Sequence, residues 1–283
     1  MALARTHGAD LAVLHVYPYL LPMGGDAPYF PSGLPLDASA RARLLSDLEA
    51  AAEPARTVGL KPQVILLEGD PAAEIARRAR TVAADLIVMG THGRRGLDRW
   101  ILGSVARSVV QRAACAVLTV PPPSEAAPPA GAVGHEHVLC PVDLGSSEET
   151  IAAAFEVARA SHARLTLLYV LEGLPQLEAS VRMAGINWPE FRDRLEASAL
   201  RNLREAVAGK EKDGIAQEVV TSGKPYREIL KLAQEKGVSL IVMGVHGMNP
   251  IERMFFGSTA LHVVQRAQCP VLTVRPSFER TKS

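Results

Sequence analysis

Two stretches with the same glycine spacing are the part of this sequence best suited to hold a ligand. One is MGTHGRRGLDRWILGS at 89–104, and the other is MGVHGMNPIERMFFGS at 243–258. Each begins in an apolar LIVMG run and continues as G-x-x-G, nine residues, and Gly-Ser. Glycine lets the backbone approach a bound group closely, and a Gly-Ser pair that opens a helix offers N–H groups and a hydroxyl to an anion. A phosphate is the natural occupant.

The pattern differs from the Rossmann fingerprint G-x-G-x-x-G and from the P-loop G-x-x-x-x-G-K-[ST]. Paired glycines also serve tight turns and close packing. The complete pattern, repeated at the same strand-to-helix junction, instead favours a nucleotide phosphate site in the second stretch. The residues that carry it are Gly90, Gly93, Gly103 and Ser104 in the first stretch and Gly244, Gly247, Gly257 and Ser258 in the second.

The two stretches belong to a longer internal repeat with an offset of 154 residues, which also aligns VVQRAACAVLTV at 109–120 with VVQRAQCPVLTV at 263–274. Between Leu86 and Pro122, 22 of 37 positions are identical in the two copies, and such self-similarity marks a structural repeat. We place one domain at residues 1–122 and the other at 137–283. A linker rich in Pro, Ala and Gly joins them at 123–136.

Each copy alternates β-branched apolar runs with longer helical patterns. In the second copy HVLCPVD, LTLLYV, QEVVTSG, LIVMG and PVLTV are expected as strands, with helices between them. This alternation predicts an α/β fold with a parallel sheet covered on both faces. Ligands of such sheets bind at the carboxyl ends of the strands, which is where both glycine stretches lie.

The pattern G-x-x-G, nine residues, G-[ST], after LIVMG and before CPVLTV, resembles the universal stress protein family over nearly the whole chain. The resemblance implies two tandem doubly wound parallel-sheet domains, each with the strand order 3-2-1-4-5. In one subgroup of the family this pattern marks ATP binding, and another subgroup lacks it. It therefore implies that an adenine nucleotide, ATP with or without Mg²⁺, is the cofactor.

The resemblance also implies which residues of the second copy hold the nucleotide. Asp143 would contact adenine or ribose, and Val170 would touch the base. A capping role before GSSEE is the alternative for Asp143, and core packing is the alternative for Val170. The rest of the predicted site surrounds the glycines: Pro141, Met243, Gly244, Gly247, Gly257, Ser258 and Thr259.

The first copy has no counterpart of residues 137–154, because Met1 aligns with Phe155. It lacks the first strand, which is central in the family's strand order, together with the aspartate. Each buried backbone group left unpaired there would cost ~1–3 kcal/mol. We expect the natural protein to start further upstream; the alternative is that the flanking strands close up or another segment fills the gap. Nucleotide binding is expected to be weaker or absent in this copy.

Two functions remain open. The first is an ATP-dependent stress-response module with at most slow hydrolysis, since phosphoryl transfer needs Mg²⁺ and a water-positioning group that no residue supplies by sequence. The second is a stress protein that binds no nucleotide and acts through dimer-like protein contacts. An adenylating enzyme is disfavoured, because VDLGSSEET does not match the Ser-Gly-Gly-x-x-Ser loop of such enzymes.

Composition argues against two classes of partner, nucleic acids and membranes. A formal net charge of +1 and an aromatic content of 5% argue against nucleic acid, and no apolar run approaches the ~20 residues of a membrane span. Three widely spaced cysteines fit a reducing, cytoplasmic setting. Since family members commonly dimerise through their last strands, Val117–Val120 is expected to pair antiparallel with Val271–Val274 as an internal pseudo-dimer. Further homo-oligomerisation stays open.

Overall fold

The structure is a computed structural model that describes residues 1–18, 37–91, 102–122, 136–143, 148–208, 216–245 and 257–275. The chain divides into two compact units, Met1–Ala83 and Ala84–Ser283. Within the described ranges no helix is both long enough and apolar enough to cross a membrane.

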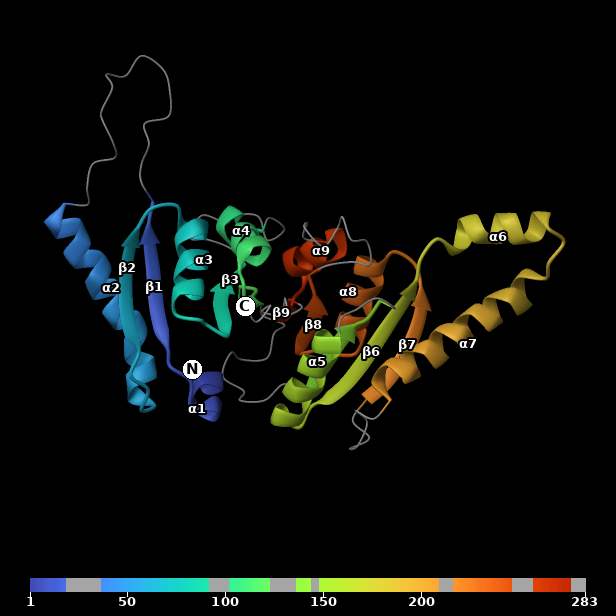
Figure 1. Cartoon of the computed structure of the whole chain (residues 1–283), viewed down its shortest axis with the longest axis horizontal. Helices are drawn as coiled ribbons and strands as arrows, with labels where there is room; N and C mark the ends of the chain where they lie inside the picture. Colours follow the sequence, from blue (N-terminus) through green and yellow to red (C-terminus); the bar gives the residue numbers. More distant parts are fainter. Residues whose placement is uncertain are drawn as a thin grey trace, which may run out of the picture. The chain divides into compact units, whose positions relative to one another are not determined.

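The first unit is built on one pair of parallel strands. Its elements are α1 (Ala2–His7), β1 (Ala12–Tyr17), α2 (Ala38–Thr57), β2 (Gln63–Glu68) and α3 (Pro71–Thr81). The strands pair in register from Ala12↔Gln63 to Tyr17↔Glu68. The helices α2 and α3 pack on opposite sides of this pair (Figure 1). The buried positions of the two helices are mostly alanine, which lets each helix lie close to the strands.

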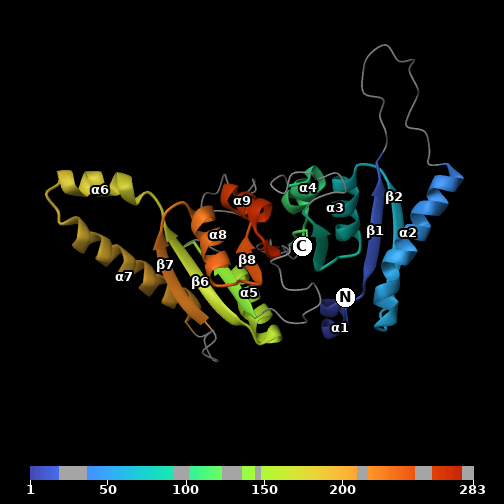
Figure 2. The ribbon, with the colours of Figure 1, turned by 180° about the vertical axis from the view of Figure 1, so that it is seen from behind.

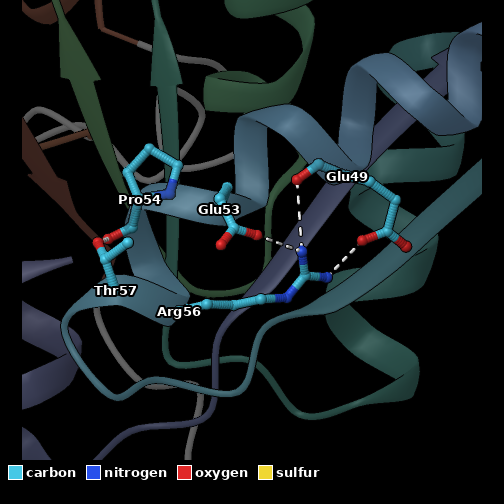
Figure 3. Close-up of polar contacts among 5 residues, drawn as sticks. All are labelled: Glu49, Glu53, Pro54, Arg56 and Thr57. Atoms are coloured by element: carbon cyan, nitrogen blue, oxygen red, sulfur yellow. Dashed lines mark hydrogen bonds and ion pairs between the residues drawn. The ribbon is translucent and has the colours of Figure 1, made fainter.

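The helix α2 continues past Pro54, although proline has no N–H and its ring crowds the preceding turn. Arg56 reaches back along the helix and donates to the Glu49 carbonyl at 3.4 Å, while its guanidinium also pairs with the carboxylates of Glu49 and Glu53 (Figure 3). The Thr57 hydroxyl donates to the Pro54 carbonyl at 2.9 Å. These side-chain hydrogen bonds link the turns on either side of the proline, although they do not reach the Ala50 carbonyl, which the missing N–H would have bonded.

The second unit contains a seven-stranded sheet with the order β3-β4-β9-β8-β5-β6-β7. Neighbouring strands are parallel except for β4 and β9, which are antiparallel. Its elements are β3 (Leu86–Gly90), α4 (Ser104–Arg112), β4 (Ala116–Val120), β5 (His137–Pro141), α5 (Glu148–Ser161), β6 (Arg164–Leu171), α6 (Leu174–Met183), α7 (Trp188–Val207), β7 (Ala216–Ser222), α8 (Pro225–Glu235), β8 (Leu240–Gly244), α9 (Ser258–Arg266) and β9 (Val271–Val274).

The second copy has the strand order β7-β6-β5-β8-β9, which is 3-2-1-4-5 in its own numbering and confirms the expected fold. One buried cluster joins α5 and α7 to the sheet through residues such as Phe155 and Leu203. A separate cluster joins α8 and α9 to the sheet through residues such as Ile229 and Val263. The helices α8 and α9 pack side by side in both views (Figures 1 and 2).

The short helix α6 was not expected from the sequence. It follows Gly173, whose φ of +75° is a left-handed conformation that favours glycine. Leu174 and Val181 of α6 pack with Trp188 of α7 in a small buried cluster. The long connection from β6 to β7 is therefore a helical pair rather than one helix.

The strands β4 and β9 form the predicted antiparallel junction between the two copies, with Leu118 opposite Leu272. The Thr119 hydroxyl donates to the Val271 carbonyl and the Thr273 hydroxyl donates to the Val117 carbonyl, each at 3.1 Å. The repeat offset relates Thr119 to Thr273 and Val117 to Val271, so the two hydrogen bonds are equivalent. The junction therefore has local twofold symmetry around Leu118 and Leu272, as an internal pseudo-dimer requires.

The strands of the first copy are divided between the two sheets. The strands β1 and β3, which flank the missing position in the family's order, belong to two different sheets. The boundary between the compact units falls between α3 and β3. The repeats at 1–122 and 137–283 are instead defined by sequence similarity.

Candidate nucleotide-binding site

The carboxyl ends of β6, β5 and β8 lie side by side, because these strands are parallel neighbours in the sheet. Val170 is the second-last residue of β6, Asp143 follows two residues after β5, and Gly244 ends β8. Gly257 is held at the same edge, since its N–H donates to the carbonyl of Val245 at 2.9 Å. The structure thus places these predicted residues at one edge of the sheet.

Asp143 leaves the end of β5 beside Tyr169 of β6. The Val142 N–H donates to the Leu168 carbonyl at 2.8 Å and so ties the segment before Asp143 to β6. Burial is the main cause that raises the pKa of Tyr169, and the negative charge of Asp143 raises it further. A half-buried carboxylate at this edge can accept hydrogen bonds from an amine or a hydroxyl of a ligand.

The start of α9 is the candidate anion-binding part of the site. Gly257 is the N-cap residue of α9 and has no side chain with which to cap the helix. The first N–H groups of a helix have no partner within the helix, and the helix dipole favours negative charge at this end. Ser258 is exposed at the first helical position, with Thr259 next to it. Phosphate oxygens would find backbone and hydroxyl donors here.

The same local geometry occurs in the first copy at Gly103. This residue has φ −56° and ψ 141°, compared with −60° and 140° at Gly257. Its N–H donates to the Thr91 carbonyl at 2.9 Å, which matches the bond from Gly257 to Val245. Since any residue can adopt these angles, conformation alone does not require glycine at either place. Glycine at both positions keeps the approach to the helix start clear of a side chain.

Three other predicted residues have structural roles that need no ligand. A Cβ on Gly244 would lie 3.3 Å from the Thr150 hydroxyl oxygen, so glycine here permits close packing of β8 on α5. The Met243 side chain is buried in the cluster under α8 and α9, and half-buried Val170 packs against that cluster. Only the backbone of Met243 is therefore available at the sheet edge.

The structure describes three of the remaining predicted residues, Pro141, Gly90 and Ser104. Pro141 is half-buried at the end of β5, opposite Leu168. In the first copy Gly90 and Ser104 are exposed at the equivalent junction. Gly93 and Gly247 lie outside the described residues.

A group of cationic and aromatic side chains next to α9 was missed by the sequence analysis. Tyr226 of α8 stacks on His262 of α9, with ring centroids 4.6 Å apart. The guanidinium carbons of Arg227 and Arg266 lie 5.8 and 5.6 Å from the centre of the Tyr226 ring. Together with Lys224, the N-cap residue of α8, these residues form what we name the Tyr226 cluster. Their proximity depends on the packing of two helices that are distant in sequence.

A cavity of about 160 Å³ opens at the opposite, amino-terminal edge of the sheet, lined by His137, Arg164, Thr166, Gln217 and others. His137 is buried, and its Nδ1 lies 3.1 Å from the carbonyl of Lys236 at the end of α8. The last carbonyls of a helix have no partner within the helix, and His137 contacts one of them. This cavity lies at the edge of the sheet opposite the candidate site. Within the described ranges no three His, Cys, Asp or Glu side chains are grouped as a metal site.

The fold and the repeated strand-to-helix junction define a tandem, doubly wound α/β protein with the same Gly-Ser helix start in each copy. The model of the universal stress protein family matches residues 1–121 and 134–275. The chain therefore belongs to the universal stress protein family, as the sequence resemblance predicts.

Named relatives agree with this assignment. Universal stress protein YxiE of Bacillus subtilis is 33% identical over 136 residues, which cover 46% of this chain and 90% of YxiE. Universal stress protein Mb2028c of Mycobacterium bovis is 29% identical over 197 residues, and the match covers 69% of this chain and 63% of that relative. A universal stress protein from Archaeoglobus fulgidus has a related crystal structure, with a TM-score of 0.69, 21% identity, and coverage of 99% of this chain and 90% of that one. This last likeness concerns the fold.

Proposed function

We propose that the second copy binds ATP at the carboxyl edge of β5, β6 and β8 and acts as a nucleotide-dependent module in a stress response. The start of α9 carries this proposal: its N-cap residue Gly257 has no side chain with which to cap the helix, the backbone angles there do not require glycine, and Ser258 is exposed at the first helical position. Asp143 lies at the same edge and would read the adenine or ribose. Family membership supports a stress-related role.

The proposal favours binding over turnover. Phosphoryl transfer needs a residue that positions the attacking water, and none of the side chains placed at this edge has that role. Mg²⁺ would arrive on the nucleotide phosphates, because the described residues offer no three-ligand group of their own. Hydrolysis is then slow at most.

Isothermal titration with ATP tests the proposal. We expect one nucleotide to bind per chain, and Asp143→Ala and Gly257→Val to weaken binding at least roughly tenfold. The valine would block the approach to the α9 N–H groups, and the alanine would remove the carboxylate acceptor. Circular dichroism melts establish that both variants are folded.

Gly103→Val is the matched control, because Gly103 has nearly the same backbone angles and the same hydrogen bond in the first copy. It should leave ATP affinity unchanged. Loss of binding in Gly103→Val but not in Gly257→Val would move the site to the first copy. No heat with millimolar ATP would reject nucleotide binding.

That last result would favour the second candidate function, a stress protein that acts through protein contacts alone. The antiparallel pairing of β4 and β9 is the observation on its side. This pairing needs no nucleotide, and it reproduces within one chain the contact through which family members are expected to dimerise.

A further inference from the structure

The Tyr226 cluster gathers positive charge beside the proposed phosphate site. The structure pairs other arginines with carboxylates, for example Arg77 with Glu74 and Arg194 with Glu190. Lys224, Arg227 and Arg266 take part in no ion pair among the described residues. All three are exposed. The guanidinium groups of Arg227 and Arg266 lie near one ring, and Lys224 is close enough to influence it. Like charges so placed repel one another, and a bound anion would relieve that repulsion.

The cluster is ordered by its own contacts. The Arg227 Nε donates to the Tyr226 hydroxyl oxygen at 3.1 Å. This hydrogen bond lowers the pKa of Tyr226, and the charges of Arg227, Arg266 and Lys224 add to the effect while desolvation opposes it. Tyr226 thus sits in a local positive field, and its ring fixes the position of two guanidinium groups.

The cluster is joined directly to the start of α9. The His262 Nδ1 lies 2.7 Å from the carbonyl oxygen of Ser258, so the imidazole donates to the first residue of the helix. His262 in turn stacks on Tyr226. The contacts therefore run from Ser258 through His262 and Tyr226 to the two arginines. Long cationic side chains placed next to a phosphate site can reach phosphates further along the same ligand.

The first copy lacks this arrangement at the equivalent positions. The repeat offset aligns Lys224, Tyr226, Arg227, His262 and Arg266 with Asp70, Ala72, Ala73, Ser108 and Arg112. Asp70 caps α3 by accepting from the Ala73 N–H at 2.7 Å, whereas Lys224 places a cation at the same point of α8 without capping it. A cationic residue in place of a capping residue at a helix N-terminus is expected where an anion binds.

We propose that the Tyr226 cluster contacts the terminal phosphates of the nucleotide and makes the site prefer nucleoside triphosphates over monophosphates. This inference rests on the proposed nucleotide site. A monophosphate is held at the start of α9 alone, whereas a triphosphate extends to Arg227, Arg266 and Lys224. A nucleic-acid backbone or an anionic membrane would also be attracted by such a patch, but neither accounts for the direct connection to Ser258.

The test compares ATP, ADP and AMP affinities of the wild type with those of the double variant Arg227→Gln/Arg266→Gln. We expect the variant to bind ATP roughly tenfold more weakly or worse and AMP within about twofold of the wild type. The ATP affinity of the wild type should fall more steeply with salt than its AMP affinity, and the variant should lose that difference. Arg112→Gln, at the matched position of the first copy, should change neither affinity.

The outcomes separate the two proposals. A wild type that binds no nucleotide rejects the proposed function itself. A wild type that binds ATP and AMP equally well, or a variant that weakens both to the same extent, keeps the nucleotide site but overturns the role of the cluster. Binding of a single-stranded oligonucleotide or of anionic phosphatidylserine vesicles, lost in the double variant while ATP affinity is unchanged, would assign the cluster to those partners instead.

Discussion

Glycine serves two different purposes at the candidate site. At Gly257 and Gly103 the backbone angles suit any residue, so conformation does not account for glycine there, and we infer that it keeps a helix start open to a ligand. At Gly244 a Cβ would crowd Thr150, so the missing side chain permits helix packing. The sequence pattern places all three glycines at the correct junctions, but it does not distinguish space for a ligand from space for a neighbouring helix. That distinction requires the three-dimensional neighbours of each residue.

His137 is the residue through which stability should depend on pH. It is buried at the start of β5, and its Nε2 lies 2.8 Å from the Thr166 hydroxyl. Burial is the main cause that lowers its pKa, and the charges of Arg164 and Lys236 lower it further, while the hydrogen bond to the Lys236 carbonyl opposes them. The folded protein therefore binds the proton more weakly than the unfolded chain, whose histidine pKa is about 6.5.

We expect this contribution to stability to be fully present above about pH 6.5 and to fall as the pH drops toward the pKa of folded His137. In His137→Gln, which removes the titrating imidazole, the loss of stability below that pH should be smaller. Urea midpoints measured between pH 8 and 5 test this, with exposed His15→Gln as the control for the loss of one imidazole. Parallel curves for wild type and His137→Gln would contradict it.

At the scale of elements, the strand order and the helices that alternate with the strands follow from apolar periodicity and from the repeat. Two features do not. The sequence LPQLEASVRM forms α6 because its apolar residues pack on Trp188 of α7, and that partner is not visible from local pattern. The Tyr226 cluster forms because α8 and α9 lie side by side, which brings together residues that are far apart in the chain.

The antiparallel junction of β4 and β9 gives a symmetric prediction. Thr119→Val and Thr273→Val each remove one buried hydroxyl donor and keep the side-chain shape. Each should lower the free energy of unfolding by about 0.5–1.5 kcal/mol, and by similar amounts, because the two bonds are equivalent. Urea denaturation of the two single variants measures this, each variant serving as the control for the other. A clear inequality would argue against the local twofold symmetry.

At the scale of the molecule, the chain divides into two units whose sheets differ in size. Among the described residues, the unit Met1–Ala83 has one pair of strands, whereas Ala84–Ser283 has seven hydrogen-bonded strands. A two-stranded sheet is marginally stable without further packing. Comparison of the two copies predicts that the first copy lacks a strand. It does not predict that β1 and β3 belong to separate sheets.

We therefore expect residues 1–83 to unfold before the rest of the chain. In hydrogen exchange at increasing denaturant, the amides of β1 should lose protection earlier than those of β6, which pairs with strands on both sides. Mass spectrometry of exchanged peptides resolves the two strands. A single transition in which β1 and β6 lose protection together would show that the chain unfolds as one cooperative body.

The junction between β4 and β9 also determines how strand pairing between the two copies responds to dilution. When two separate chains associate through such an edge, the pairing is lost at low concentration and subunits can be exchanged with other members of the family. Here both strands belong to one polypeptide, so their encounter does not depend on concentration. The two unlike halves are consequently present in a fixed one-to-one ratio in every molecule, and neither half can be replaced by a competing subunit while this pairing is intact.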